Sequence, residues 1–147
     1  YKVDVIVSTH PRTLKKIKKE KVSLNSKVRL LKPLSFSDYN NLQLNSRCVL
    51  SDSGTISEES SILNFPALNI REAHERPEAM EEASVIMTGL DFNRIKESIE
   101  VLDDQLRGDD RTLSLVKDYS SQNVSDKVLR IILSYTDYIR RNVWKEY

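Results

Sequence analysis

Short apolar runs alternate with stretches of helical spacing over the first ninety residues. Runs rich in valine, isoleucine and leucine predict strands at 3–8, 28–31, 47–50, 67–70 and 84–88. Apolar residues that recur every three or four positions predict helices at 12–20, 35–45, 54–64 and from Pro77 onward. The first run is apolar nearly throughout, which predicts a strand buried on both faces. This alternation predicts an α/β domain with an open parallel sheet.

The last third of the chain has only helical patterns. Asp91 opens one helix, and the charged stretch RGDDR interrupts it. A second helix begins near Val124 and has an apolar stripe at Val128, Ile132, Tyr135, Ile139 and Val143. Such a stripe must pack against another surface. We expect it to face a part of the molecule outside this sequence or to favour a homodimer.

Charge and composition exclude several classes of partner. Lys and Arg total 23 against 22 for Asp and Glu, so the net charge of +1 predicts neither nucleic acid nor membrane as a partner. Residues 2–32 hold ten bases and two acids, and their lysines at 15, 16, 18 and 19 are interpreted as a solvated helix face. No apolar stretch reaches the roughly 18 residues of a membrane span.

The cysteine and histidine content bears on disulfides, on the compartment of the protein and on metal binding. The lone Cys48 cannot form an internal disulfide and suits a reducing compartment, so we expect a cytoplasmic protein. It lies in a strand-like run, which favours a small buried hydrophobe. Two histidines and one cysteine make a metal site a poor prediction. The chain starts at Tyr1 directly before a strand, so we expect a piece of a longer polypeptide.

The stretch SDSGTISEES follows a predicted strand and starts a predicted helix. A helix start offers unpaired N–H groups and the positive end of the helix dipole, which together bind anions such as phosphate. Gly54 lets the backbone approach closely, and the hydroxyls of Ser53 and Thr55 can donate to phosphate oxygens. Either Glu58 or Glu59 could accept hydrogen bonds from a ribose diol, which predicts a nucleotide site.

An ordinary helix cap is the alternative for this stretch. Asp52 or Ser53 would cap the helix, acids in the first turn would favour the dipole, and nothing would bind. Two more strand exits favour the site over the cap. His10 follows the first strand, and a loop containing Arg71, His74 and Arg76 follows the fourth. Exits of parallel strands share one edge of the sheet, where ligands bind.

Structural roles are the alternative for these loops as well. A lone histidine at a strand end is more often structural than a ligand-binding group, and Glu75 with Arg76 could form a simple salt bridge. Agreement among three loops is harder to obtain by accident. The set suits a diphosphate.

Four motifs now resemble the C-terminal domain of the non-hydrolysing UDP-N-acetylglucosamine 2-epimerase family. They are a strand ending in His10, a Pro-Leu segment, a DSG loop with two following glutamates, and an Arg loop ending in ERPE. Their order and spacing hold from residue 3 to about 90. The resemblance implies a GT-B type fold of two Rossmann-like domains, with the sugar nucleotide in the cleft between them.

The resemblance implies a domain organisation. Residues 1–90 would form the Rossmann-like nucleotide-binding region, without the first strand of that domain, and residues 91–147 would be its helical C-terminal segment. The N-terminal catalytic domain would be absent, so this part alone would be inactive.

The resemblance also implies roles for single residues. Ser53 and the backbone of Gly54 and Thr55 would hold the diphosphate, Glu59 the ribose, and Tyr39 would lie by the uracil. His10 and Arg71 would face the diphosphate and the reacting sugar as catalytic residues, and Glu75 and Arg76 would be secondary.

The chemistry implied by the resemblance is inversion at carbon 2 of a UDP-N-acetylhexosamine. The family eliminates UDP to form a glycal-type intermediate and adds it back on the new face, without cofactor or metal. Helix N-termini and arginine stabilise a departing diphosphate. Proton removal at carbon 2 needs carboxylates, which the family takes from its N-terminal domain.

Departures from the family pattern suggest a branch. Thr55 stands where the commonest members have a second glycine, Ser60 stands where alanine is usual, and THPR replaces a His-x-Asn-Pro pattern. The variant is most similar to the bacterial branch that forms UDP-N-acetyl-L-fucosamine for capsule or O-antigen. Two other functions stay open: a UDP-sugar glycosyltransferase of the same architecture, and a non-catalytic module for UDP-sugar sensing or assembly.

Overall fold

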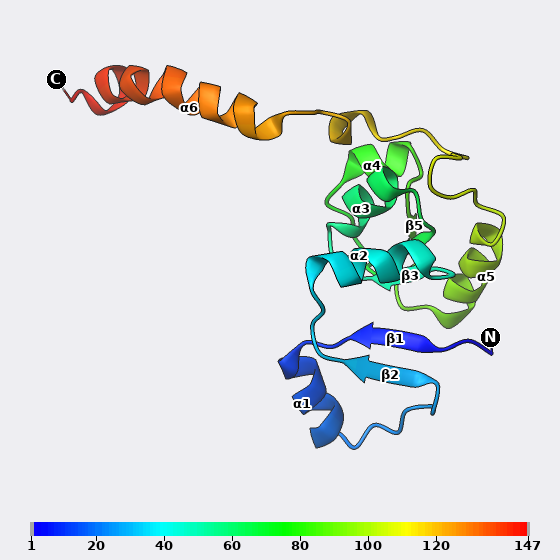
Figure 1. Ribbon diagram of the computed structural model, residues 1–147. Coiled ribbons are helices and arrows are strands. Elements are labelled where there is room, and N and C mark those ends of the chain that lie inside the picture. Colours follow the sequence, from blue (N-terminus) through cyan, green and yellow to red (C-terminus); the bar gives the residue numbers. More distant parts are fainter. Residues whose placement is uncertain (1, 147) are drawn as a thin grey trace. The chain divides into compact units, whose positions relative to one another are not determined.

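The chain divides into two compact units, Tyr1–Ser46 and Arg47–Tyr147. The computed structural model describes residues 2–146, so Tyr1 and Tyr147 lie outside the described residues (Figure 1). We describe each unit by itself.

The first unit contains two strands and two helices. They are, in chain order, β1 (Val5–Ser8), α1 (Pro11–Lys19), β2 (Val28–Leu31) and α2 (Phe36–Asn45). The strands pair in parallel, with Val5 opposite Val28. Ser35 caps α2, because its Oγ accepts a hydrogen bond from the backbone N–H of Asp38 at 3.2 Å. The predicted elements of this part are confirmed.

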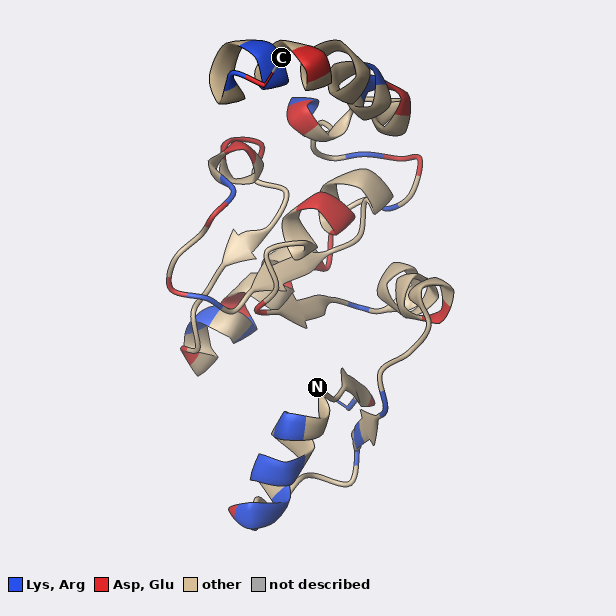
Figure 2. Cartoon of the chain, turned by 90° about the vertical axis from the view of Figure 1, so that its left-hand side faces the viewer, with Lys and Arg blue, Asp and Glu red and all other residues tan. Residues whose placement is uncertain are grey.

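Burial in the first unit differs from one expectation. Most of β1 is exposed, with Val5 at 47% and Ile6 at 46%, and Val7 is half-buried, so the predicted burial on both faces is wrong. Within residues 2–146, β1 pairs only with β2, and an apolar run alone does not say how many layers cover a strand. The four lysines of α1 are exposed, which confirms the solvated face. Figure 2 shows α1 largely in the blue of Lys and Arg.

The second unit is built on three parallel strands. Its elements are β3 (Val49–Ser51), α3 (Ile56–Leu63), β4 (Ala67–Asn69), α4 (Pro77–Glu81), β5 (Ile86–Met87) and α5 (Phe92–Leu102). The strand order is β3-β4-β5, with Val49 opposite Ala67 and Leu68 opposite Ile86. Every residue of the central strand β4 is buried. The predicted parallel α/β architecture is confirmed.

One apolar cluster forms the core of this unit. Ile56, Phe65, Ala67 and Val85 are buried together, and Val49, Leu63 and Met80 pack against them. The cluster joins the start of α3 to the sheet, because Ile56 is the first residue of α3 and Ala67 the first residue of β4. Packing of this cluster therefore fixes where α3 begins relative to β3 and β4.

A connection after α5 is tied to the end of α3. Asn64 adopts a left-handed backbone conformation with φ of 53°, and its Nδ2 donates to the carbonyls of Gly108 and Asp110 at 2.9 and 2.7 Å. Arg111 donates to two carbonyls in the last turns of α3. The sequence predicted only an interruption at RGDDR, so this anchoring of the interruption is a finding of the structure.

The C-terminal segment is helical, as predicted. A short 3-10 helix, η1 (Lys117–Tyr119), precedes α6 (Val124–Ile139), and a π-helix, η2 (Arg140–Trp144), follows. No residue of α6 is buried. Of the predicted apolar stripe, Ile139 is half-buried and the other members are exposed, with Val143 in η2. None of the helices within residues 2–146 is long and apolar enough to span a membrane.

Ser60 offers a test of the core of the second unit. Its buried hydroxyl lies within hydrogen-bond distance of the carbonyls of Phe65, at 3.0 Å, and Ser84, at 2.8 Å. We expect Ser60→Ala to lower the free energy of unfolding by about 1–3 kcal/mol, since it removes the donor to two carbonyls. Urea unfolding measures this loss. Ser134→Ala, on the exposed surface of α6, is the matched control and should change stability by less than about 0.5 kcal/mol. Equal stability of the two variants would contradict the role of the Ser60 hydroxyl.

Candidate functional site

The turn between β3 and α3 is organised by its own hydroxyls. Ser51 Oγ accepts from the backbone N–H of Ser53 at 3.1 Å, and Ser53 Oγ accepts from the N–H of Thr55 at 3.3 Å. The hydroxyls of Ser53 and Thr55 share a hydrogen bond of 2.9 Å. Because one shared bond uses only one of the two hydroxyl hydrogens, the other hydroxyl can still donate to a ligand. The turn therefore presents a donor at an exposed helix start.

Helix α3 begins without a side-chain cap. Thr55 occupies the N-cap position with φ of −66° and ψ of −14°, and no side chain bonds the N-terminal turn from there. The alternative of an ordinary cap by Asp52 or Ser53 is therefore wrong. The reason is local: Ser53 Oγ is used within the turn, by the N–H and hydroxyl of Thr55. Hydrogen-bond donors at the start of α3 thus do not have the side-chain acceptor that an ordinary cap supplies.

Arg71 and Glu75 form an ion pair in the loop between β4 and α4. Arg71 Nη2 donates to Glu75 Oε1 at 2.8 Å. The hydrogen bond from Arg71, with its positive charge, holds the pKa of the Glu75 carboxyl below its ordinary value. A Cβ built at Gly54 would lie 3.8 Å from Glu75 Oε2, so this carboxylate stands next to the β3–α3 turn. The structure therefore brings an arginine–carboxylate pair to the turn that contains Ser53.

Arg76 pairs with Glu58, in the first turn of α3. Its Nε donates to Glu58 Oε1 at 2.7 Å, and this bond raises the pKa of the guanidinium. The expected alternative, a simple salt bridge between Glu75 and Arg76, is wrong: Glu75 pairs with Arg71, and Arg76 donates to Glu75 only at its backbone carbonyl. Sequence spacing favours neighbours, whereas the fold brings Glu58 to Arg76 from 18 positions away.

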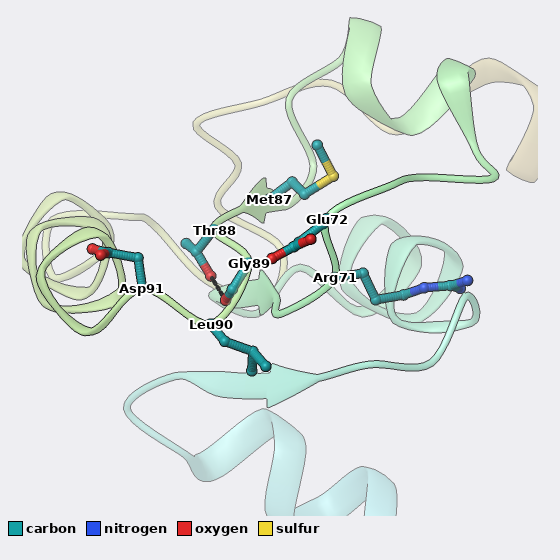
Figure 3. A pocket seen from close by; sticks show the side chains of 7 residues that line it. All are labelled: Arg71, Glu72, Met87, Thr88, Gly89, Leu90 and Asp91. Carbon is teal, nitrogen blue, oxygen red and sulfur yellow. Dashed lines mark hydrogen bonds between the residues drawn. The ribbon is translucent and has the colours of Figure 1, made fainter.

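A hollow at the exit of β5 was missed by sequence reasoning. It has a volume of about 310 Å³ and is lined by Arg71, Glu72 and the residues from Met87 to Asp91. Figure 3 shows that the Arg71 side chain extends away from Thr88 and Asp91. Gly89 has φ of 61°, in the left-handed region that favours glycine, and a Cβ there would lie 3.4 Å from Glu72 Cγ. A glycine directly after a predicted strand was the available signal.

Two predicted site residues belong to the first unit. His10 is the N-cap of α1, and its Nδ1 accepts from the backbone N–H of Arg12 at 3.1 Å. Tyr39 lies half-buried in α2. Their approach to the Ser53 turn stays a prediction. Glu59, predicted for the ribose, lies half-buried in the first turn of α3, next to Glu58.

The described residues offer little to a metal or to thiol chemistry. Within residues 2–146 no group of three or more His, Cys, Asp or Glu side chains could hold a metal ion. Burial raises the pKa of Cys48 to about 11, which leaves the thiol protonated near neutral pH. Cys48 is half-buried, whereas the sequence predicted a buried side chain.

Known proteins are similar to this chain over most of its length. The family model described as UDP-N-acetylglucosamine 2-epimerase matches residues 1–133. The protein of that name from Methanocaldococcus jannaschii is 31% identical over 106 residues, which are 69% of this chain and 29% of that protein. The corresponding protein from Campylobacter jejuni is 30% identical over 134 residues, 89% of this chain and 34% of that protein.

Solved structures agree with the fold. The UDP-N-acetylglucosamine 2-epimerase from Rickettsia bellii is 49% identical, with a TM-score of 0.88 over 97% of this chain and 39% of that chain. The M. jannaschii enzyme, solved in complex with UDP-GlcNAc and UDP, is 26% identical, with a TM-score of 0.77 over 89% of this chain and 36% of that chain. The predicted fold class, including the helical tail, is confirmed.

This chain spans about a third of the length of the relatives that it matches. The family match covers far more than half of the chain. The chain belongs to the UDP-N-acetylglucosamine 2-epimerase family.

Proposed function

We propose that this chain is the UDP-sugar-binding part of an enzyme that inverts carbon 2 of a UDP-N-acetylhexosamine. The observation that supports it most directly is the β3–α3 turn: paired hydroxyls of Ser53 and Thr55 at a helix start that has no side-chain cap. A turn of this kind suits a diphosphate, because N–H groups, hydroxyls and the helix dipole all favour negative charge. Family membership supports UDP as the nucleotide.

The Arg71–Glu75 pair suggests an exchange step, in which Arg71 leaves the Glu75 carboxylate and binds the diphosphate. In the structure Glu75 is the acceptor for Arg71 and stands beside Gly54. A diphosphate bound at the turn would offer Arg71 new anionic acceptors, and the nearby Glu75 carboxylate would be repelled. Arg71 would then turn from the carboxylate to the phosphate, as charge-assisted pairs of either kind are of similar strength. The β4–α4 loop would thus respond to the ligand.

Other residues of the proposed site follow from the resemblance. Glu59 would accept hydrogen bonds from the ribose, and Tyr39 would lie by the uracil. His10 would face the diphosphate and the reacting sugar. Its Nδ1 is used as a cap acceptor for α1, so Nε2 is the nitrogen available to a ligand. Glu75 and Arg76 would act through other residues.

The reaction proposed for the whole enzyme is elimination of UDP from carbon 1 with loss of the proton at carbon 2. UDP then re-adds to carbon 1 with its original configuration, and a proton returns to the opposite face of carbon 2. The turn and Arg71 would stabilise the diphosphate as the bond between its oxygen and carbon 1 breaks. Proton removal and return at carbon 2 need carboxylates on both faces of the sugar. We infer that those carboxylates lie in the part of the enzyme that matches the rest of the relatives' length, since this chain spans about a third of it.

Finer assignments stay proposals. Residues 1–90 would form the nucleotide-binding region and residues 91–147 its helical segment. The substrate branch would be the one that forms UDP-N-acetyl-L-fucosamine for bacterial capsule or O-antigen, working in the cytoplasm. The exposed stripe of α6 is compatible with a homodimer.

Assembly of the active enzyme tests the reaction. Joined to the remaining N-terminal part of the R. bellii enzyme, which is 49% identical in the region matched here, the chain should convert UDP-N-acetylhexosamine to its carbon-2 epimer without any acceptor. A joined protein that folds but transfers the sugar only to an acceptor would favour a glycosyltransferase. One that binds UDP and catalyses neither reaction would favour a sensing module.

Calorimetric titration tests the diphosphate assignment. We expect tighter binding of UDP than of UMP or ADP, and Ser53→Ala should weaken UDP binding roughly tenfold, since a hydrogen bond to a charged group contributes about 1.5–3 kcal/mol. Glu59→Gln should weaken UDP binding through the ribose. Ser134→Ala, far along the chain on α6, is the control and should bind as the unaltered protein does. Unchanged affinity in both site variants would refute the assignment.

Arg71→Gln should have two linked effects. UDP binding should weaken roughly tenfold, because one charge-assisted contact to the diphosphate is lost. The pKa of Glu75 should rise toward its ordinary value, because Arg71 is the main cause of its depression. Because the Glu75 pKa is depressed in the folded state, the ionised carboxylate stabilises that state at pH values above the ordinary carboxyl pKa. This contribution to stability is lost as the pH falls through the depressed pKa.

Carboxyl-detected NMR over a pH series measures the Glu75 pKa in both proteins, and calorimetry measures the affinity. Arg94→Gln is the matched control, because Arg94 also faces a carboxylate on its own segment, Glu97 at 3.7 Å. That variant should leave both the affinity and the Glu75 pKa unchanged. A Glu75 pKa unaffected by Arg71→Gln would contradict the exchange step.

A further inference from the structure

The Glu58–Arg76 ion pair joins the two segments of the proposed site. Glu58 lies in the first turn of α3, three residues after Thr55. Arg76 is the N-cap residue of α4 and directly follows Glu75. The pair therefore links the helix that starts at the β3–α3 turn to the loop that contains Arg71, at the end of that loop.

Geometry and burial make this pair more specific than an ordinary surface contact. Arg76 Nε donates to Glu58 Oε1 at 2.7 Å, with the two side chains 38% and 28% exposed. Glu58 Oε2 is buried and has no hydrogen-bond partner within residues 2–146. The Glu58 carboxylate thus depends on Arg76 for compensation of its charge. Removing either side chain breaks the ion pair between α3 and the loop, since the remaining bond of Arg76, to the Glu75 carbonyl at 3.2 Å, stays within the loop.

Neighbouring carboxylates do not compete for Arg76. Glu78 accepts a hydrogen bond from the Tyr119 hydroxyl at 2.9 Å, and Glu75 accepts from Arg71. Burial, followed by the bond to Glu78, raises the pKa of the Tyr119 hydroxyl, so it remains a donor at neutral pH. Glu75 and Glu78 thus each have their own donor. Glu58 is left as the carboxylate that holds Arg76.

We propose that Glu58 and Arg76 are positioning residues for UDP-sugar binding. Their ion pair holds the end of the β4–α4 loop against the first turn of α3, which keeps Arg71 and Glu75 beside the Ser53–Gly54–Thr55 turn. Neither residue needs to touch the ligand. This inference rests on the proposed function, because the loop is positioned for the diphosphate that the turn is proposed to bind.

A double-mutant cycle on the intact chain tests the inference. Glu58→Gln and Arg76→Gln should each weaken UDP binding roughly tenfold, and the double variant should be no weaker than either single variant, since all three lack the same ion pair. Arg76→Lys keeps a positive charge within reach of Glu58 and should recover most of the affinity. Calorimetry is done at a temperature where circular dichroism shows every variant folded.

A second ion pair of the same unit provides the matched control. Arg47 Nε donates to Asp103 Oδ1 at 2.8 Å, away from the turn and the β4–α4 loop. Arg47→Gln should lower the melting temperature as the site variants do and leave UDP affinity unchanged. If Glu58 and Arg76 only stabilised the fold, Glu58→Gln and Arg76→Gln would likewise lower the melting temperature and leave UDP affinity unchanged.

Three outcomes would overturn the inference. In the first, Glu58→Gln and Arg76→Gln bind UDP like the unaltered chain while Ser53→Ala weakens binding; the proposed function then stands without the positioning pair. In the second, Arg76→Gln weakens binding and Glu58→Gln does not, which makes Arg76 a direct ligand contact. In the third, the folded unaltered chain does not bind UDP, and the proposed diphosphate site fails together with the inference.

Discussion

Parallel pairing of β3 with β4 is the constraint on which the proposed site depends. Adjacent parallel strands end at the same edge of a sheet, so the turn after β3 and the loop after β4 must be neighbours. The buried cluster around Phe65 then fixes the start of α3 against the sheet, because Ile56 belongs to both. A helix start, two hydroxyls and an arginine loop come together as a consequence of topology.

Electrostatics explains how this edge is stable without a ligand. The start of α3 has no side-chain cap, and the loop beside it contains arginines, so the edge favours negative charge. Glu75 and Glu58 supply that charge from within the protein, each bonded to a different arginine. The two pairs differ in setting: Glu75 stands in the exposed part of the loop, whereas Glu58 is half-buried. An incoming diphosphate would exchange with the first pair and be positioned by the second.

Local signals in the sequence predicted the elements, and contacts between distant residues had to come from the structure. Asp91 caps the helix that it was expected to open, and Ser35 caps α2 in the same way, because capping involves residues only three positions apart. The bond from Asn64 to Gly108 spans 44 positions, and that from Arg76 to Glu58 spans 18. No periodicity or motif specifies such partners. For the site, the sequence indicated the turn and the arginine loop, and the alternative salt bridge between Glu75 and Arg76 is replaced by the bond from Arg76 to Glu58.

The central claim is that the β3–α3 turn binds the diphosphate of a uridine nucleotide, and the glycines of the chain allow a direct test. With only three glycines, a protein labelled with ¹⁵N-glycine gives three amide signals, from Gly54 in the turn, Gly89 at the hollow and Gly108 in the connection after α5. Titration with UDP should shift the Gly54 signal most and leave Gly108 unmoved, whereas UMP should shift Gly54 far less. An unmoved Gly54 signal in a folded protein saturated with UDP would contradict the account.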